Sequence, residues 1–567
     1  MFRSVVIAFV SLLSLNVAQA QQLRLIASSE QSPPDAPPGS LFQHFTAVHI
    51  SPSGSVVFGA TGSDPAETYT NGIYAERNGT LVRITDNLSV GTAQTFVPPF
   101  PMNAAGDVTY FAVIPGSGSA WRLNTAAGLT IDRVRRGDPF PGLENRSITQ
   151  VQGNSINWSG PRKLPESRAG FVFATPSPSP QPNNPPISGI ITVDPLDNRL
   201  PVALVGSASS APLPLFNSLG WPRDLNESGH AVFLGDPAGD APLGAYYWNG
   251  EELVRLLQLG DNIPGVSPPV PVNSIMNVRI NDAGEVLLVV RGTSGGMRFL
   301  LGPPNDLRPV LSTDDLVTGG SQQLRVAPLF FEVPFYALGN DGSIHVFTRA
   351  FGLPPNLGIY NCVVKASRNS PPTIRWHAGE PVRMPDGTLQ MTLALPDSSA
   401  TIATLGTNRL AWRVGLAGQS NTQAICMLND DGDPVAVITG GSEINLPSGP
   451  RLLSPTLMNN FTQFGDFSKH VNDAGDLVIA TALVGSPAAS VIVAANAPEF
   501  PCGDPDFNND GVYPTDQDMI DFFNVYTGTP CPTLRCDTLD FNRNGSSPED
   551  QDVIDFLAVL AGGSCGD

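Results

Sequence analysis

A short turn-and-strand pattern recurs along most of this 567-residue chain and restricts the folds open to it. In four of the copies an Asn-x-x-Gly sequence predicts a tight turn, because glycine is free to take a positive φ. The alternating apolar residues after the glycine predict a half-buried strand. The copies are ISPSGSVVF (50–58), MNAAGDVTYF (102–111), PESRAGFVF (165–173), LNESGHAVF (225–233), INDAGEVLLV (280–289), LGNDGSIHVF (338–347) and VNDAGDLVIA (471–480), with a degenerate eighth copy, LGTNRLAWRV, at 405–414.

One or two further short strands follow each copy, and Asn78-Gly79 and Asn249-Gly250 have the sequence of hairpin turns. A repeat of three or four antiparallel strands over roughly 50 to 70 residues is typical of a β-propeller blade. The last copy is short, because only ASVIVAANA (489–497) remains before the chain changes in character. The segment QLRLIASSEQSPPDAPPG (22–39) resembles the third strand and exit loop of other copies, such as LVRLLQLGDNIPG (253–265). We therefore expect residues 21–497 to form a mainly β domain, an eight-bladed β-propeller closed by the N-terminal strand, with seven blades as the alternative.

The chain begins MFRSVVIAFVSLLSLNVAQA (1–20), a basic residue and an apolar stretch followed by small residues, which predicts a secretory signal peptide. No later apolar stretch is long enough to cross a membrane. Residues 502–567 carry a net charge of −11, whereas the rest of the chain carries only −9 of the total of −20. A nucleic-acid partner is not expected, because phosphate binding requires clustered Lys and Arg. We expect a secreted or cell-surface protein with a separate acidic domain over 498–567.

The turn-and-strand copies resemble those of secreted bacterial tandem NxxGxxxF-repeat proteins, which carry various C-terminal anchors. This resemblance implies a propeller-like fold and an anchoring tail, and it implies no particular reaction.

Several exit loops of the repeat place an acid beside Gly and Pro, and these acids are the candidates for ligand binding. Asp138, Asp261 and Glu380 would lie at equivalent positions of different blades, at one end of the propeller. Asp beside Gly also suits a turn, which is the structural interpretation of the same residues. Two such carboxylates could serve as general acid and base. Cys362 and Cys426, on the expected second strands of adjacent blades, are either a disulfide or two buried thiols.

Two copies of one acidic loop lie near the C-terminus, DFNNDGVYPTDQD (506–518) and, 34 residues later, DFNRNGSSPEDQD (540–552). Calcium is bound by six to eight oxygen ligands, and the D-x-[DN]-x-[DN]-G pattern supplies three of them on one turn. A backbone carbonyl at the seventh position would add another. The sequence therefore predicts two calcium ions, held in the first loop by Asp506, Asn508, Asp510 and the carbonyl of Val512, and in the second by Asp540, Asn542, Asn544 and the carbonyl of Ser546.

The end of each loop departs from the usual pattern, in which position twelve is an acid. That position holds Gln517 in the first copy and Gln551 in the second. We expect loops one residue longer, closed by Asp518 and Asp552, with Asp516 and Asp550 as the alternatives. An apolar helical run follows each loop, DMIDFFNVY and DVIDFLAVL.

One loop followed by one helix, twice over, resembles the cysteine-bearing (GC-type) dockerin domain of secreted bacterial proteins. The resemblance implies two calcium ions, two antiparallel helices, and attachment to a cohesin-like protein or a cell-surface component. The four cysteines repeat with the loops, and the simplest pairing is Cys502–Cys531 with Cys536–Cys565, although a crossed pairing keeps the symmetry too.

The expected function is that of a secreted, non-catalytic binding or scaffold protein whose propeller binds a glycan or protein ligand and whose tail anchors it. The alternative is a polysaccharide-active hydrolase or lyase that uses the exit-loop carboxylates and is targeted by the same tail.

Overall fold

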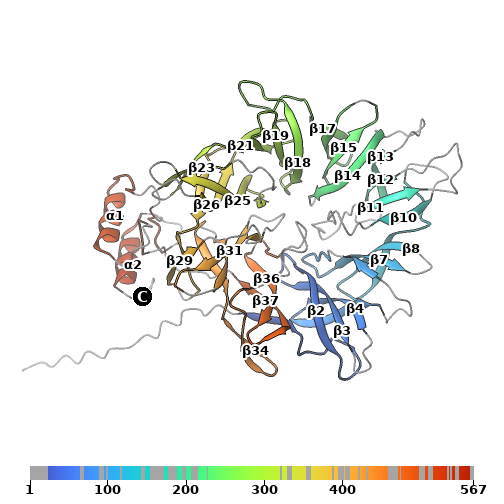
Figure 1. The fold of residues 1–567 in the computed structure, drawn as a ribbon, viewed down its shortest axis with the longest axis horizontal. Helices are drawn as coiled ribbons and strands as arrows, with labels where there is room; N and C mark the ends of the chain where they lie inside the picture. Colours follow the sequence, from blue (N-terminus) through green and yellow to red (C-terminus); the bar gives the residue numbers. More distant parts are fainter. Residues whose placement is uncertain are drawn as a thin grey trace, which may run out of the picture.

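The protein, a computed structural model, is mainly β, with two helices at its C-terminal end (Figure 1). The structure describes residues 23–63, 69–87, 95–97, 100–114, 118–141, 147–152, 172–176, 188–193, 199–205, 215–226, 228–239, 241–319, 322–327, 335–352, 359–385, 388–393, 401–402, 409–418, 422–429, 432–457, 470–472, 474–496, 503, 505–508, 515–532, 536, 539–542 and 548–561. Among these residues, no helix has both the length and the apolar character needed to cross a membrane.

The first part of the chain forms four-stranded antiparallel sets in which sequential strands pair. One eight-stranded sheet contains two such sets, joined by a short parallel contact between β13 and β14. The sets are β2 (Leu41–Ile50), β3 (Val56–Ser63), β4 (Tyr69–Arg77) and β5 (Thr80–Asp86); β6 (Thr95–Val97), β7 (Val108–Ile114), β8 (Gly118–Asn124) and β9 (Thr130–Arg135); β10 (Ile148–Gln152), β11 (Val172–Pro176), β12 (Ser188–Val193) and β13 (Arg199–Val205); β14 (Leu215–Leu225), β15 (Ala231–Pro237), β16 (Gly244–Trp248) and β17 (Leu253–Gln258); and β18 (Val272–Ile280), β19 (Val286–Gly292), β20 (Met297–Gly302) and β21 (Arg308–Ser312).

Later sheets keep this plan and add a two-stranded hairpin after the exit turn. The sixth set is β24 (Phe335–Leu338), β25 (Ser343–Gly352), β26 (Ile359–Ser367) and β27 (Thr373–His377), with the hairpin β22 (Leu316–Gly319) and β23 (Gln322–Val326). The seventh is β30 (Thr401–Ile402), β31 (Ala411–Leu416), β32 (Gln423–Leu428) and β33 (Pro434–Thr439), with β28 (Pro381–Arg383) and β29 (Leu389–Leu393). The last sheet contains β36 (Asp476–Leu483), β37 (Ser486–Asn496) and β1 (Arg24–Ser28), and the hairpin β34 (Glu443–Leu446) and β35 (Gly449–Leu452) precedes it.

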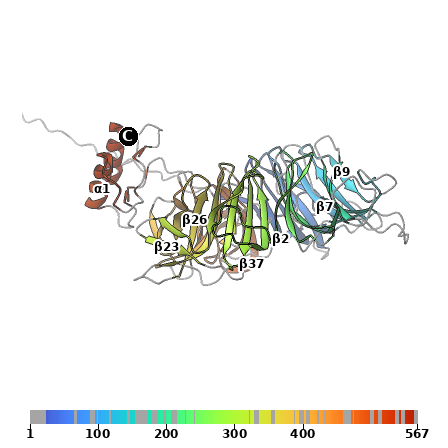
Figure 2. The same ribbon diagram turned by 90° about the horizontal axis from the view of Figure 1, so that it is seen from above.

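The sheets follow one another around a centre in a propeller-like arrangement (Figure 1), and they form a flat slab when seen from above (Figure 2). The sheet that contains β19 packs on both faces. Leu288 of β19 belongs to a buried cluster that includes Val232 of β15, whereas its neighbour Leu287 belongs to one that includes Val346 of β25. Successive side chains of a strand point to opposite faces, so a strand covered on both sides is a continuous apolar run. This explains the sequence VLLVV in β19.

The repeated turn joins the first and second strands of a set and is held by its asparagine. At Asn281, Oδ1 accepts a hydrogen bond from the backbone N of Glu285 at 2.8 Å, and Gly284 has a φ of 82°. Glycine is required there, because other residues rarely adopt this conformation. The predicted turn glycines are confirmed by positive φ values at Gly54, Gly106, Gly229, Gly284, Gly342 and Gly475, while Gly170 and part of the degenerate copy lie outside the described residues.

The same asparagine also links neighbouring sheets. Asn281 Nδ2 donates to the carbonyl of Gly339, which lies in the turn of the next set, at 2.8 Å. Asn226 Nδ2 likewise donates to the carbonyl of Asn281 at 3.2 Å. An amide can accept within its own turn and donate to the next one, which a carboxylate cannot do. This dual role accounts for asparagine at the first position of the turn.

Phe58 and Phe233, which each end a copy, are core residues. Phe58 lies against Phe42, Phe45 and Tyr74, with ring centroids 5.6 to 5.9 Å apart. The hairpin expected at Asn78-Gly79 joins β4 and β5, and both residues have a positive φ, as a type I′ turn requires.

The β-sheets between residues 23 and 496 are called the body below. The N-terminal segment pairs with the C-terminal end of this body. β1 is antiparallel to β37, with Arg24 opposite Ala494 and Ser28 opposite Val491. Gln31 then forms a turn in which its side chain accepts from the backbone N of Ser28 at 3.0 Å. The backbone N of Phe42, in β2, donates to the carbonyl of Gln31 at 3.1 Å. β1 thus occupies the outer position that the fourth strand holds in other sets.

Candidate metal centre in the C-terminal module

Two helices of equal length follow the two acidic loops, as the sequence predicted: α1 (Asp516–Tyr526) and α2 (Asp550–Leu560). A capping box starts α1, in which Thr515 Oγ1 accepts from the backbone N of Asp518 and Asp518 Oδ2 accepts from the backbone N of Thr515 at 3.1 Å. Glu549 takes the place of Thr515 before α2, where its backbone N donates to Asp552 at 3.0 Å. In both copies the carboxylate of the third helical residue, Asp518 or Asp552, therefore accepts a hydrogen bond from the backbone at the end of the loop.

The acidic C-terminal domain, residues 498–567, is called the module below. Four phenylalanines form its core, two from the loops and two from the helices. Phe522 and Phe556 stack with ring centroids 4.1 Å apart and an interplanar angle of 5°. Phe507 lies edge-on to Phe522 and Phe541 lies edge-on to Phe556. All four side chains are fully buried. The two copies of the sequence therefore pack against each other through equivalent residues.

The two candidates for the closing ligand differ in burial. Asp518 and Asp552 are each 0% exposed, whereas Asp516 and Asp550, on the first turns of the same helices, are exposed. The backbone N of Asn542 donates to Asp552 Oδ1 at 3.3 Å, which joins the second loop to the start of its helix. The structure thus places Asp518 and Asp552 where the loop and the helix meet, the position that a closing ligand needs.

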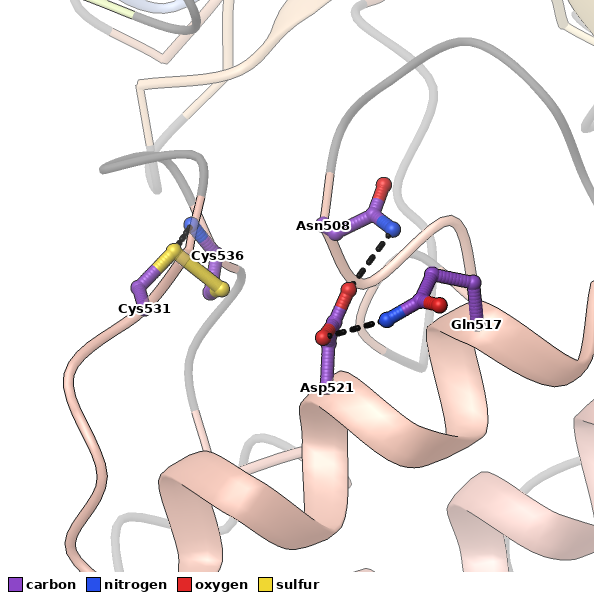
Figure 3. Close-up of a disulfide and its surroundings, with 5 residues drawn as sticks. All are labelled: Asn508, Gln517, Asp521, Cys531 and Cys536. Atoms are coloured by element: carbon purple, nitrogen blue, oxygen red, sulfur yellow. Dashed lines mark hydrogen bonds between the residues drawn. A yellow bond between two sulfur atoms is a disulfide. The ribbon is translucent and has the colours of Figure 1, made fainter.

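Gln517 and Gln551, which hold the usual acid position, contact another residue. Gln517 Nε2 donates to Asp521 Oδ1 at 2.8 Å, and Asn508 Nδ2 donates to the other oxygen of the same carboxylate at 2.9 Å (Figure 3). The second copy repeats both bonds. Gln551 Nε2 and Asn542 Nδ2 donate to Asp555 at 3.0 Å each.

Sequence reasoning missed Asp521 and Asp555. A signal was present, because an acid occupies the same place on the apolar face of both helices, four residues after the glutamine. Only 3% and 2% of their surfaces are exposed, respectively. Residues four apart lie on one face of a helix, so each glutamine can reach the acid that follows it.

The loops are only partly within the described residues. Asp506 and Asn508 are buried and Asp540 and Asn542 are half-buried, while Asp510, Val512, Asn544 and Ser546 lie outside the described residues. Over the part of the chain that the structure describes, no three His, Cys, Asp or Glu side chains form a group that could hold a metal ion. The donors that are described are carboxylate and amide oxygens, which fit a hard cation such as calcium. Asp506 also lines a cavity of about 30 Å³ with Asn429 and Asp433, beside β33 of the body.

The cysteine pairing differs from the simplest prediction. Cys531 and Cys536 are bonded to each other (Figure 3), so neither can pair with Cys502 or Cys565 as expected. The two bonded cysteines are five positions apart and lie on the segment between α1 and the second loop. Cys502 and Cys565 lie outside the described residues. In the body, Cys362 and Cys426 are free, buried thiols and form no disulfide, and burial raises the pKa of Cys362 to about 12.

The three exit-loop acids lie at equivalent turns of different sheets, and each accepts a hydrogen bond from the backbone N three residues earlier. The donors to Asp138, Asp261 and Glu380 are Arg135, Gln258 and His377, at 2.9, 3.0 and 2.9 Å. Gln31 makes the same contact after β1. These side chains therefore have a structural role in the turn.

Two of these acids also pair with basic side chains. Asp138 Oδ2 lies 2.7 Å from Arg199 Nη1 at the start of β13, and both side chains are largely buried. Glu380 Oε1 lies 3.1 Å from His377 Nε2. The structure does not gather Asp138, Asp261 and Glu380 into one site, because each remains bound to its own turn.

Comparison with known proteins assigns no family to the chain. No family model matches it, and no curated protein does. Among solved structures, puromycin hydrolase aligns with 13% identity and a TM-score of 0.33, over 72% of this chain and 57% of that one. The acylaminoacyl peptidase of Pyrococcus horikoshii aligns with 10% identity and a TM-score of 0.32, over 70% and 52%. The WD40 domain of SCAP from fission yeast aligns with 8% identity and a TM-score of 0.35, over 84% and 95%. The chain thus spans little more than half the length of the two hydrolases.

Proposed function

We propose that this chain is a secreted, non-catalytic binding or scaffold protein. Its body is an eight-bladed β-propeller closed by β1, and its C-terminal module binds two calcium ions and anchors the propeller to a cohesin-like protein or a cell-surface component. The buried acids at the loop–helix junctions, Asp518 and Asp552, are the observation that carries the calcium assignment.

Eight blades are supported by the contacts between the last sheet and the first. Asn472, in the turn before β36, donates to the carbonyl of Ser51 at 3.1 Å, the bond that joins other neighbouring turns. Arg24 of β1 also pairs with Glu76 of β4. A propeller closed in this way leaves only short, protected sheet edges. The seven-bladed alternative would need one of the four-stranded sets to lie outside the ring.

Each calcium site would use a carboxylate and an amide from the loop and the buried acid in the first turn of the helix. In the first these are Asp506, Asn508 and Asp518, with Asp510 and the carbonyl of Val512; in the second they are Asp540, Asn542 and Asp552, with Asn544 and the carbonyl of Ser546. Calcium would neutralise these acids and join each loop to its helix, so binding would contribute to the folding of the module. The acids would hold the ion through their oxygens and fix the loop.

Anchoring is supported by apolar side chains on the outer faces of both helices. Ile520 and Phe523 of α1 are 47% and 36% exposed, and the equivalent Ile554 and Leu557 of α2 are 54% and 38% exposed. Exposed apolar side chains in a small, acidic module favour a protein partner. Secretion rests on the apolar N-terminal segment, which lies outside the described residues.

The enzymatic alternative receives less support. General acid and base catalysis needs carboxylates that can exchange protons with a substrate. Asp138, Asp261 and Glu380 instead accept hydrogen bonds from the backbone of their own turns. We therefore favour binding over catalysis on this face.

Calorimetric titration of the full chain with calcium tests the proposal. We expect two sites, one lost in Asp518→Asn and the other in Asp552→Asn, because each change removes a charged ligand. The exposed residue Asp516 provides a control of equal charge, and Asp516→Asn should keep both sites. Absence of calcium uptake by the unchanged chain, or equal binding by all variants, would refute the proposed sites.

A further inference from the structure

Both helices of the module bury a second acid, three residues after Asp518 or Asp552, and this acid contacts the loop. Asp521 and Asp555 lie beside the buried Phe522 and Phe556 and are almost completely buried themselves. A buried carboxylate is costly unless it is hydrogen-bonded. Each of these carboxylates receives two hydrogen bonds from amide groups, one from the loop and one from its own helix.

These contacts fix the orientation of the loop asparagine. An ionised carboxylate only accepts hydrogen bonds, so the NH₂ group of Asn508 must face Asp521. The oxygen Oδ1 is the other branch of the same planar amide and therefore points away from the helix, as Figure 3 shows. In the second copy Asp555 imposes the same orientation on Asn542.

The glutamine completes the arrangement from the other side. Gln517 Nε2 occupies the second carboxylate oxygen of Asp521, which holds the carboxylate in one rotamer. Gln551 does the same for Asp555. This contact explains why glutamine stands where the usual calcium loop has an acid: its side chain is directed at the helix and not at the loop.

We propose that Asp521 and Asp555 are positioning residues for the two calcium loops. Each one turns its asparagine so that Oδ1 faces the loop as a ligand, and Gln517 and Gln551 hold the acids in place. This inference rests on the proposed calcium binding, and it assigns a role to four residues that supply no ligand. Residues that orient metal ligands typically contribute about 10- to 100-fold to metal affinity.

Calorimetric calcium titration of the full chain tests the role, with one copy serving as the internal reference for the other. Asp521→Asn places an amide against Gln517 or Asn508, so one donor loses its acceptor. We expect the affinity of one site to fall by about 10-fold or more while the other site is unchanged. Asp555→Asn should weaken the second site instead. Asp516→Asn removes the same charge from α1 at an exposed position and should change the affinity less than 3-fold.

A reciprocal exchange separates positioning from general structural support. In the double variant Asn508→Asp with Asp521→Asn, the new amide donates to the new carboxylate and still accepts from Gln517, and the net charge is that of the original chain. We expect this exchange to restore calcium affinity to that of the unchanged chain or above. If Asp521 had only a structural role, Asp521→Asn would lower the unfolding temperature equally in calcium and in chelator. The double variant would then not restore calcium binding.

Three outcomes decide between the proposals. Two calcium sites of unchanged affinity in Asp521→Asn would overturn the positioning role and leave the calcium sites intact. Equal losses of calcium affinity in Asp521→Asn and Asp516→Asn would overturn the positioning role as well, because the lost charge alone would then explain the weaker binding. Failure of the unchanged chain to bind calcium would overturn both this role and the proposed function.

Discussion

Asn472 donates a hydrogen bond from Nδ2 to the backbone carbonyl of Ser51 at 3.1 Å, although the two lie 421 positions apart in the sequence. The same bond joins Asn226 to Asn281 and Asn281 to Gly339 in sets that follow one another along the chain. The first and last sheets therefore meet through the contact used by consecutive sheets. The proposed closure of the propeller rests on this contact and on the pairing of β1 with β37.

Replacing the turn asparagine should destabilise the body wherever it makes this contact. Asn472→Ala removes the bond to Ser51 and the one that Oδ1 accepts from the backbone N of Asp476 at 2.8 Å. We expect a loss of about 2–3 kcal/mol, because buried groups are left without partners. Denaturant titration followed by tryptophan fluorescence measures it, since all six tryptophans lie in the body.

Asn281→Ala should lower the free energy of unfolding by a similar amount. The control Asn445→Ala, at an exposed position of β34, should change it by less than about 0.5 kcal/mol. A loss at Asn281 without one at Asn472 would contradict the equivalence of the last contact with the others.

His470 should make the body sensitive to acid. Burial lowers the pKa of His470 to about 4, against 6.5 for an exposed histidine, while its Nδ1 lies 3.2 Å from the carbonyl of Val478. The unfolded chain therefore binds a proton that the folded chain does not, so the contribution is fully present above pH 6.5 and is lost as the pH falls toward 4. The loss should reach about 3 kcal/mol, at 1.36 kcal/mol for each pKa unit.

Measurement of the free energy of unfolding between pH 7 and pH 4 tests this effect. His470→Gln keeps a donor for the carbonyl of Val478 and should reduce the slope over this range. The same substitution at exposed His44 should leave the slope as it is. An unchanged slope in His470→Gln would show that other groups cause the acid sensitivity.

The exit-loop acids should contribute to stability through their turns. Asp138→Ala removes an acceptor for the backbone N of Arg135 and the partner of Arg199, and we expect a loss of about 1.5–3 kcal/mol. Asp261→Ala removes the acceptor for the backbone N of Gln258 and should cost about 1 kcal/mol. Asp261→Asn keeps an acceptor oxygen and should be nearly neutral in the same denaturant titration. A larger loss in Asp261→Asn than in Asp261→Ala would contradict the turn role.

The disulfide should link the two copies of the module through a short loop. Peptide mapping without reduction should recover Cys531 and Cys536 on one cross-linked peptide. Changing both residues to serine should destabilise the module by about 2 kcal/mol, because closing so short a loop restricts the unfolded chain only modestly. Recovery of Cys531 bonded to Cys502 would show the other pairing.

Local structure followed closely from the sequence. The turn at Asn281 was predictable because its bonds join residues four apart, and the turn residues specify them directly. The helices of the module were predictable for a similar reason, since each is an apolar helical run that directly follows an acidic loop. For Asp261 the sequence allowed both a turn role and a ligand role, because an acid beside glycine suits both a turn and a ligand site.

Contacts between segments were predicted less well. The exact repeat of the four cysteines favoured symmetric pairs, but the fold brings Cys531 and Cys536 together on the connection between the two copies. Asp521 was absent from the predicted site, because its importance depends on Asn508, which reaches it only after the loop folds back on the helix. Cys362 and Cys426 lie in neighbouring sheets, and the sequence left their pairing open.

The sequence by itself determined where the chain turns, which strands alternate, and where two acidic loops precede two helices, because these features depend on residues within a few positions of one another. The tertiary structure decided which partners those residues meet. The turn asparagine donates to a neighbouring sheet, β1 pairs with a strand more than 450 residues away, and Asp521 orients a loop residue 13 positions earlier. Such contacts depend on how sheets and helices pack, and spacing along the chain does not specify that packing.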